Sequence, residues 1–207
     1  KILNSNRKNF DKILNKLINS RKKKIQSNLI SVKNIIQDVK KNGDKALLKY
    51  EKRFNKNNKI IPTSRSISKS ISGLDKRVKK AIDLAYNRIY KFHSLQKNKN
   101  ITYTDNLKNR LDYKYFPIDS VAIYVPGSKA SYPSSVLMNA IPAIVAGVKR
   151  IVMINPAYKS KHNPAVLYAA HKCKVKEIYS IGGPAAIAAV TYGTKKIVKV
   201  NKIVGPG

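Results

Sequence analysis

The feature that most constrains the fold is a regular alternation of apolar runs and helical stretches in the second half of the chain. Short runs rich in β-branched residues predict strands at residues 120–125, 150–154, 176–181 and 200–204. Helices are predicted between them, at residues 134–146, 163–173 and 184–192. Apolar runs without a polar face are typical of strands buried on both sides, so the pattern predicts a parallel sheet covered by helices.

Capping residues predict where the helices of this half begin and end. Ser134 or Ser135 is expected to cap the first helix, and Gly147 is expected to end it. Pro142 lies inside that helix, where the missing N–H and the ring should kink or split it. Asn163 is followed by a proline, a pair that is typical of an N-cap and the first helical turn.

The first half of the chain is polar, rich in lysine and helical in pattern. Apolar residues recur at helical spacing over residues 29–39 and again over residues 74–95. Gly43 interrupts the first stripe, and Asp44 is expected to cap a second helix. Residues 56–69 contain proline, serine and threonine and predict a loop with at most a short strand. We interpret the apolar stripes as surfaces that pack in the core.

The predicted fold class is therefore α/β, with a helical N-terminal region followed by an incomplete Rossmann-like parallel sheet. We place the helical N-terminal region at residues 1–110 and the incomplete Rossmann-like half-domain at residues 111–207. In open parallel sheets, ligands bind beyond the carboxyl ends of the strands. Each predicted strand ends in a loop that contains glycine or proline, at residues 126–128, 155–156, 182–184 and 205–207. Such loops let backbone approach a phosphate, although glycine is also common in turns that bind nothing.

The net charge of +33, from 43 basic and 10 acidic residues, has two interpretations. One is binding to nucleic acid or to an anionic membrane, since neutralised phosphates release counterions. The other is compositional drift towards lysine, asparagine and isoleucine, whose codons are rich in A and T. Drift is favoured because the basic residues are mostly lysine and are spread along the chain instead of forming one stripe. Weak, non-specific nucleic-acid binding would follow from the charge in either case.

Several classes of site are not supported by the sequence. The chain has one cysteine, Cys173, so no intrachain disulfide can form. His171 lies two residues away from it on a predicted helix, so the two side chains do not share a face, and we expect no metal ligands within this chain. His93 is interpreted as structural. No apolar run reaches the length of a membrane span and no secretory signal is evident, so we expect a cytoplasmic protein.

One long segment resembles a known enzyme family. Residues 122–156 read AIYVPGSKASYPSSVLMNAIPAIVAGVKRIVMINP. They resemble the histidinol dehydrogenase pattern YVPGG-x-A-x-YPSSVLM-x-A-x-PA-x-VAGV. The likeness continues through residues 163–194 and ends at KVNKIVGPG. The helical half also resembles that family, over VKNIIQDVKKNGDKALLKYEKRFN. The resemblance covers most of residues 28–207, which is too long a match to arise by chance.

The resemblance implies a zinc-dependent, NAD-linked homodimer of histidine biosynthesis, which oxidises L-histidinol to L-histidine while reducing two NAD⁺. The tyrosine of the YVPG motif matches Tyr124, which the resemblance makes an NAD contact. The glutamine of the GGAQAIAA motif falls on Ala185, because this chain reads GGPAAIAA. Losing that side chain would cost about 1–3 kcal/mol of binding if its partner stays unpaired. A further NAD contact, an asparagine, would follow Gly207.

The zinc ligands and the Glu–His acid–base pair of the family would also follow the last residue of this chain. The resemblance therefore implies the N-terminal part of such an enzyme, with no catalytic residue of its own, and we expect it to be inactive alone. Ser128 and Lys174 replace glycines of the family pattern, and Asn55 and Asn201 stand where aspartate is common. These departures leave two alternatives open: a non-catalytic basic remnant with weak nucleic-acid binding, and a degraded reading frame.

Overall fold

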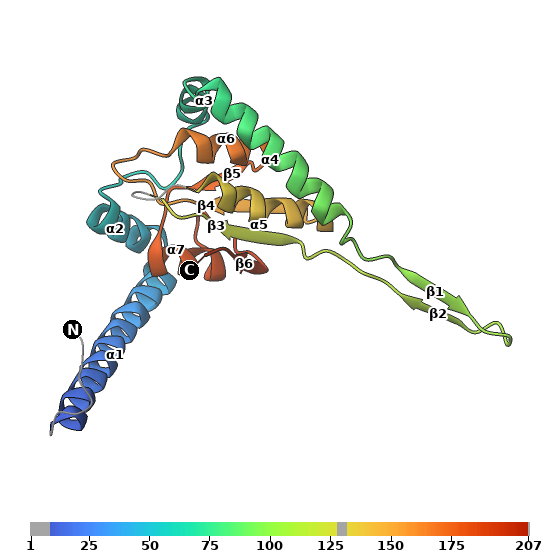
Figure 1. The fold of residues 1–207 in the computed structure, drawn as a ribbon. Helices are drawn as coiled ribbons and strands as arrows, with labels where there is room; N and C mark the ends of the chain where they lie inside the picture. The colour runs from blue at the N-terminus through green and yellow to red at the C-terminus, as the bar shows by residue number, and fades with distance from the viewer. Residues whose placement is uncertain (1–8, 128–131, 207) are drawn as a thin grey trace.

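The computed structural model describes residues 9–127 and 132–206, without the side chains of residues 20–28, and has a parallel sheet at its centre (Figure 1). The sheet consists of β3 (Ser120–Tyr124), β4 (Arg150–Ile154), β5 (Glu177–Tyr179) and β6 (Lys202–Val204). Its strand order is β5-β4-β3-β6, and all three pairings are parallel. The predicted parallel sheet is thus confirmed.

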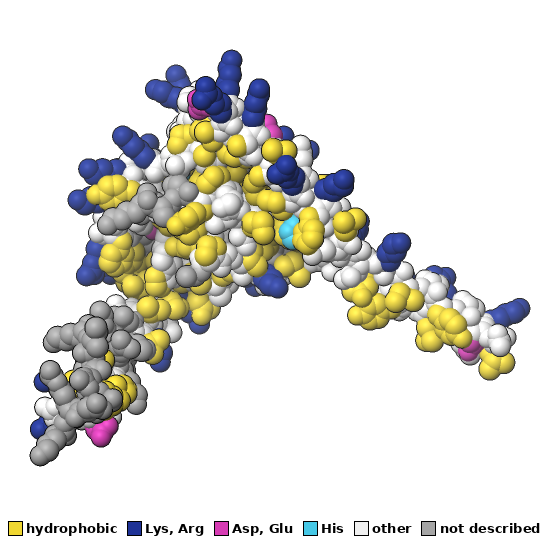
Figure 2. All heavy atoms as spheres, in the orientation of Figure 1, with side chains coloured by type: hydrophobic (Ala, Val, Ile, Leu, Met, Phe, Trp, Pro, Cys, Tyr) yellow, Lys and Arg dark blue, Asp and Glu magenta, His cyan; other side chains and the backbone are white. Residues whose placement is uncertain are grey.

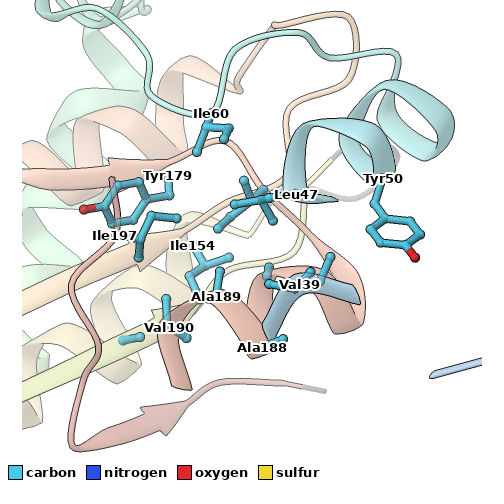
Figure 3. Close-up of a cluster of buried hydrophobic side chains, with 14 of the residues drawn as sticks. Val39, Leu47, Tyr50, Ile60, Ile154, Tyr179, Ala188, Ala189, Val190 and Ile197 are labelled. Atoms are coloured by element: carbon cyan, nitrogen blue, oxygen red, sulfur yellow. The ribbon is translucent and has the colours of Figure 1, made fainter. Parts of the chain in front are cut away.

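Helices cover both faces of this sheet. One face packs against α7 (Gly183–Tyr192), the end of α1 (Phe10–Asn42) and α2 (Asp44–Asn55). The other packs against α5 (Pro133–Ala146) and α6 (Pro164–Lys172), which α3 (Ser64–Ser72) and α4 (Lys76–Ser94) cover from outside. Neighbouring strand residues alternate between the faces, since Ala122 belongs to one buried cluster and Ile123 to the other. We call these clusters the α7-side core, drawn in Figure 3, and the α5-side core.

The boundaries of α5 correct two details of the prediction. Residue Tyr132 is the N-cap of α5 and its side chain makes no capping bond, so neither Ser134 nor Ser135 caps this helix. Both serines instead lie inside the first turn, because the helix begins at Pro133, a residue whose fixed φ suits that position. The helix also runs unbroken through Pro142, so the proline does not split it.

The N-caps of α2 and α6 were also predicted from the sequence. Gly43, with φ at +52°, is the N-cap of α2, and Asp44 is its first helical residue, so the expected aspartate cap is wrong. A glycine adopts that backbone conformation without the clash that a Cβ would add. At α6 the prediction is confirmed, because the Asn163 side chain accepts a hydrogen bond from the Ala165 N–H at 2.8 Å.

A helix lies where residues 56–69 predict a loop. Helix α3 begins at Ser64, and the Thr63 hydroxyl caps it by accepting from the Ser66 N–H at 3.2 Å. Ile67 and Ile71 then pack against the α5-side core. The serine-rich composition concealed this helix, since serine and threonine favour both loops and helix caps.

A hairpin was also not predicted. Strands β1 (Ile101–Thr104) and β2 (Arg110–Tyr113) pair antiparallel, and every residue of both strands is exposed. The Asp105 carboxylate closes the turn by accepting from the N–H groups of Leu107 and Asn109. The hairpin projects from one side of the molecule, and the start of α1 projects from another (Figure 1). None of the described helices is long and apolar enough to cross a membrane.

Candidate functional site

The carboxyl ends of the four parallel strands meet at one edge of the sheet, and the loops that follow them line two adjoining cavities. The glycine cavity, of about 420 Å³, lies among the loops after β3, β4 and β5 and includes Gly127, Pro156 and Gly182. The β6 cavity, of about 470 Å³, lies between α1, α7 and the end of β6 and is largely apolar. Together we call them the strand-end site. Ser128 and Gly207, which belong to two of the predicted loops, lie outside the described residues.

Tyr124 stands where the two cavities join. It is the last residue of β3, and it lines both cavities together with Gly183 and Pro184. Its hydroxyl accepts a hydrogen bond from the Gly183 N–H at 3.2 Å. The side chain is half-buried, so its ring is available to a molecule in either cavity.

The turn from β5 into α7 requires its two glycines. A Cβ on Gly182 would lie 2.6 Å from Cγ of Pro156, which is closer than real Cβ atoms approach. Gly183 has φ at +61°, a left-handed conformation that favours glycine, and a Cβ there would meet nothing within 4 Å. The backbone at Gly183 is therefore open to the strand-end site, at the N-terminus of a helix that favours anions.

A buried carboxylate, not predicted from the sequence, holds this turn from below. Glu51 on α2 is 1% exposed, and its Oε1 accepts from the Gly182 N–H at 2.8 Å. Its Oε2 accepts from the side-chain amide of Asn55 at 2.8 Å. Burial raises the pKa of Glu51, and hydrogen bonds from Asn55, Gly182 and the Asn57 side chain partly offset that effect. An aspartate at position 55 would instead face the Glu51 carboxylate with like charge. The sequence signal that could have indicated this role is a glutamate on the apolar stripe of α2, next to Tyr50.

A second buried network links the loops after β3, β4 and β5. The Asn155 side-chain amide donates to the carbonyls of Val125 and Pro126 at 3.0 and 3.2 Å. His162 bridges the Asn155 side-chain oxygen and the Ser180 hydroxyl, at 2.8 and 2.7 Å. Burial lowers the pKa of His162 to about 4, so the ring is neutral at neutral pH. The sequence did not predict this network, although it singled out the loop at residues 155–156, because the hydrogen-bond partners come from separate loops.

Of the other residues singled out by the sequence, Ala185 lies at the strand-end site, whereas Asn201 and Lys174 precede β6 and β5 at the opposite edge of the sheet. Ala185, on the first turn of α7, is 2% exposed and presents only a methyl group to the glycine cavity. The Asn201 side-chain oxygen accepts from the backbone N–H and the hydroxyl of Ser120, at 3.1 and 2.6 Å, and so joins β6 to β3. Lys174 follows α6 with φ at +55°.

Metal-binding side chains do not gather in the part of the chain that the structure describes. No group of three or more His, Cys, Asp or Glu side chains lies together there. Cys173 is buried, and burial raises the pKa of its thiol to about 12, so it stays protonated. His93 lies near the end of α4 and its ring contacts the Gln96 side chain at 2.6 Å. The described residues therefore do not fit a zinc site.

Comparison with known proteins points to a single family. The family model described as histidinol dehydrogenase matches residues 18–207. A histidinol dehydrogenase of Pelagibacter ubique is 73% identical over 207 residues, which are 100% of this chain and 48% of that protein. One from Agrobacterium fabrum is 47% identical over 181 residues, covering 86% of this chain and 42% of the relative.

A solved structure agrees with these sequences. The crystal structure of histidinol dehydrogenase from Elizabethkingia anophelis matches with a TM-score of 0.82 and 37% sequence identity, over 86% of this chain and 42% of that one. The chain thus spans a little under half the length of the relatives that it matches. A family model that covers most of the chain and a shared fold lead to one conclusion: the chain belongs to the histidinol dehydrogenase family.

Proposed function

We propose that the strand-end site binds NAD⁺ and that the whole protein oxidises L-histidinol to L-histidine. The observation that carries the proposal is the contact between the Tyr124 hydroxyl and the Gly183 N–H, at the point where two cavities join. It lies at the carboxyl edge of a parallel sheet, where dinucleotides bind in folds of this kind. We infer the reaction from membership of the family and the cofactor position from the strand-end site.

The residues of the site suit a dinucleotide. Both cavities are within the range of about 300–1,000 Å³ that is common for ligand pockets. The open backbone at Gly183 and the N-terminus of α7 favour a phosphate, and the apolar walls favour a flat ring. When bound, NAD⁺ accepts hydride from the alcohol. Within this chain, Tyr124 orients the cofactor and the glycine turn receives it, whereas Ala185 contributes no hydrogen bond.

Zinc, a second subunit and a cytoplasmic location complete the proposal. The family resemblance is the ground on which we place the zinc ligands and the proton-transferring residues outside this chain. The homodimer and the cytoplasmic location are proposed from the family alone. Nucleic-acid binding is less favoured, since the lysines and arginines on the face drawn in Figure 2 stand apart over several elements.

A titration of the 207-residue chain with NAD⁺ tests the cofactor site directly. We expect measurable binding, and we expect Tyr124→Phe to weaken it several-fold, since a neutral hydrogen bond contributes about 0.5–1.5 kcal/mol. Tyr90→Phe, at an exposed tyrosine on α4, is the matched control and should bind as the unmodified chain does. Equal NAD⁺ affinity for all three proteins would refute the role of Tyr124.

A chimaera tests the reaction. The 207 residues replace the equivalent, 73% identical residues of the Pelagibacter ubique protein, and the whole is assayed with L-histidinol, NAD⁺ and zinc. We expect NADH formation by the chimaera and none by the 207-residue chain alone. Turnover by the 207-residue chain would contradict the placement of the catalytic groups outside it. A folded but inactive chimaera would count against a working cofactor site.

A further inference from the structure

Glu51 is a buried carboxylate to which the proposed function gives no role. It comes from α2, in the helical region, yet its carboxylate ends beneath the loop after β5. It is 1% exposed, and burying a carboxylate is costly unless its oxygens accept hydrogen bonds. Glu51 does not line the strand-end site, but it binds Gly182, which does, so a carboxylate buried at this place calls for a functional explanation.

The partners of Glu51 show what the carboxylate holds. One oxygen accepts from the Gly182 N–H and the other from the Asn55 side chain, both at 2.8 Å. In the part of the chain that the structure describes, no lysine or arginine forms an ion pair with Glu51, although the chain has 43 basic residues. Its strongest interactions are therefore directed at backbone and amide groups next to the glycine turn.

Two consecutive amides of that turn donate to side chains from different elements. The Gly182 N–H points to Glu51, and the Gly183 N–H points to the Tyr124 hydroxyl. Pro156 closes the third side, since its ring lies where a Cβ of Gly182 would be. Moving the turn would therefore break the contact with Tyr124 as well as the contact with Glu51.

We propose that Glu51 is a positioning residue for the dinucleotide site, holding the Gly182–Gly183 turn and, through it, the Tyr124 hydroxyl in the geometry that receives the cofactor. The identity of the ligand rests on the proposed function. Glu51 touches neither cofactor nor substrate in this role. The helical region thereby shares in forming the site, because the side chain that sets the turn comes from α2.

A purely structural role makes a different prediction. If Glu51 only joined α2 to α7, its loss would lower the stability of the fold and leave the NAD⁺ affinity of the folded protein unchanged. If it positions the turn, NAD⁺ affinity falls in protein that is still folded. The NAD⁺ affinity of folded protein and the rate of hydrogen exchange at the Gly182 amide together distinguish a structural role from a positioning role.

The first experiment compares Glu51→Ala, Glu51→Asp and Glu51→Gln in the 207-residue chain, each confirmed as folded by circular dichroism and titrated with NAD⁺. Alanine removes the acceptor and aspartate is one methylene too short, so both should weaken binding about tenfold or more. Glutamine keeps an acceptor for Gly182 while the Asn55 amide turns over to accept from it, so binding should fall less than about threefold. Asp83→Asn, which breaks a surface ion pair between α4 and α6, should not change the affinity.

The second experiment needs no ligand. Hydrogen exchange at the Gly182 amide should accelerate about tenfold or more in Glu51→Ala or Glu51→Asp, while amides of β4 keep their protection. If the alanine variant does not fold, the Glu51→Asp variant provides both measurements. Unchanged NAD⁺ affinity in the folded alanine and aspartate variants, or unchanged exchange at Gly182, would overturn the proposal. Absence of NAD⁺ binding by the unmodified chain would instead refute the proposed function, and exchange at Gly182 would still decide whether Glu51 holds the turn.

Discussion

Lys174 occupies a backbone conformation that glycine adopts at no steric cost. Its φ of +55° follows the end of α6, and its N–H donates to the His171 carbonyl at 2.9 Å. A left-handed conformation costs a residue with a Cβ about 1–2 kcal/mol. The family pattern has glycine at this position, so the structure gives a physical reason for that preference.

Lys174→Gly is therefore expected to raise the free energy of unfolding by about 1 kcal/mol, which corresponds to roughly 2–4 °C in melting temperature for a chain of this size. Calorimetry measures the change. Lys176→Gly, at an exposed lysine without positive φ, should destabilise instead. Similar losses of stability in both variants would show that the φ of Lys174 carries no strain.

His162 should make stability depend on pH. Its folded pKa of about 4 lies below the ordinary value of 6.5, so the ring is neutral in folded and unfolded chains above about pH 6.5. As the pH falls from 6.5 towards 4, the unfolded chain takes up the proton first. The folded state then loses stability, by at most about 3 kcal/mol for this group.

Urea unfolding at several pH values between 7 and 4 measures this loss, with His162→Gln as the non-titrating comparison. The Asp38 carboxyl has its pKa lowered to about 2, chiefly by the hydrogen bond from Lys49. Asp38 loses its contribution to stability only at more acid pH, and this loss is the same in both proteins. Parallel stability curves for the two proteins over this range would contradict a half-buried His162 that stays neutral.

At the scale of elements, the structure separates helices that build the core from a hairpin that does not. The side chains of β1 and β2 are exposed along their whole length, including Tyr103 and Leu111. The two strands pair only with each other. The sequence could not distinguish this hairpin from other polar segments, because neither strand has the buried face that produces a clear alternation of apolar and polar residues.

Replacing residues 101–114 with a short Gly-Ser linker should therefore leave the melting temperature within about 2 °C, since changes away from the core are usually worth less than about 0.5 kcal/mol. Thermal unfolding followed by circular dichroism makes the measurement. The linker keeps Asn100 and Tyr115, which are joined by a hydrogen bond at the hairpin base. A larger drop would mean that the hairpin supports the core.

The strands of the parallel sheet were predictable because they are short, continuous apolar runs, and most helices were predictable because their apolar residues follow the period of 3.6 residues. Helix α3 was not, since its stabilising contacts come from Ile67 and Ile71 against distant helices. The same distinction applies at the strand-end site. Tyr124 could be found from a motif, whereas Glu51 depends on a contact with Gly182, 131 residues away, and His162 on one with Ser180, 18 residues away.

At the scale of the whole molecule, the helical region and the sheet share their cores. Leu47 on α2 is fully buried in the α7-side core together with Val152 and Ile154 of β4 (Figure 3). Ile82 on α4 is buried in the α5-side core with Met153 of the same strand. The first half of the chain therefore covers both faces of the sheet built by the second half.

Leu47→Ala should lower the free energy of unfolding by about 2–5 kcal/mol, the range for a buried leucine that leaves a cavity. Because the core is shared, we expect one cooperative transition. Hydrogen exchange of β4 amides should report the same loss as circular dichroism of the helices. A variant in which β4 keeps its full protection while helices α1 and α2 melt would show that the two halves are independent.

The sequence by itself determined the alternation of strands and helices in the second half of the chain, the parallel sheet, the family and the match of Tyr124 to a motif, since apolar patterns and motifs are local properties of the chain. Only the tertiary structure decided that α2 places Glu51 beneath the glycine turn, that His162 bridges two loops and that the hairpin stands clear of the core. These features depend on which distant residues the folded chain brings into contact, and hydrogen bonds between them leave no periodic pattern in the sequence.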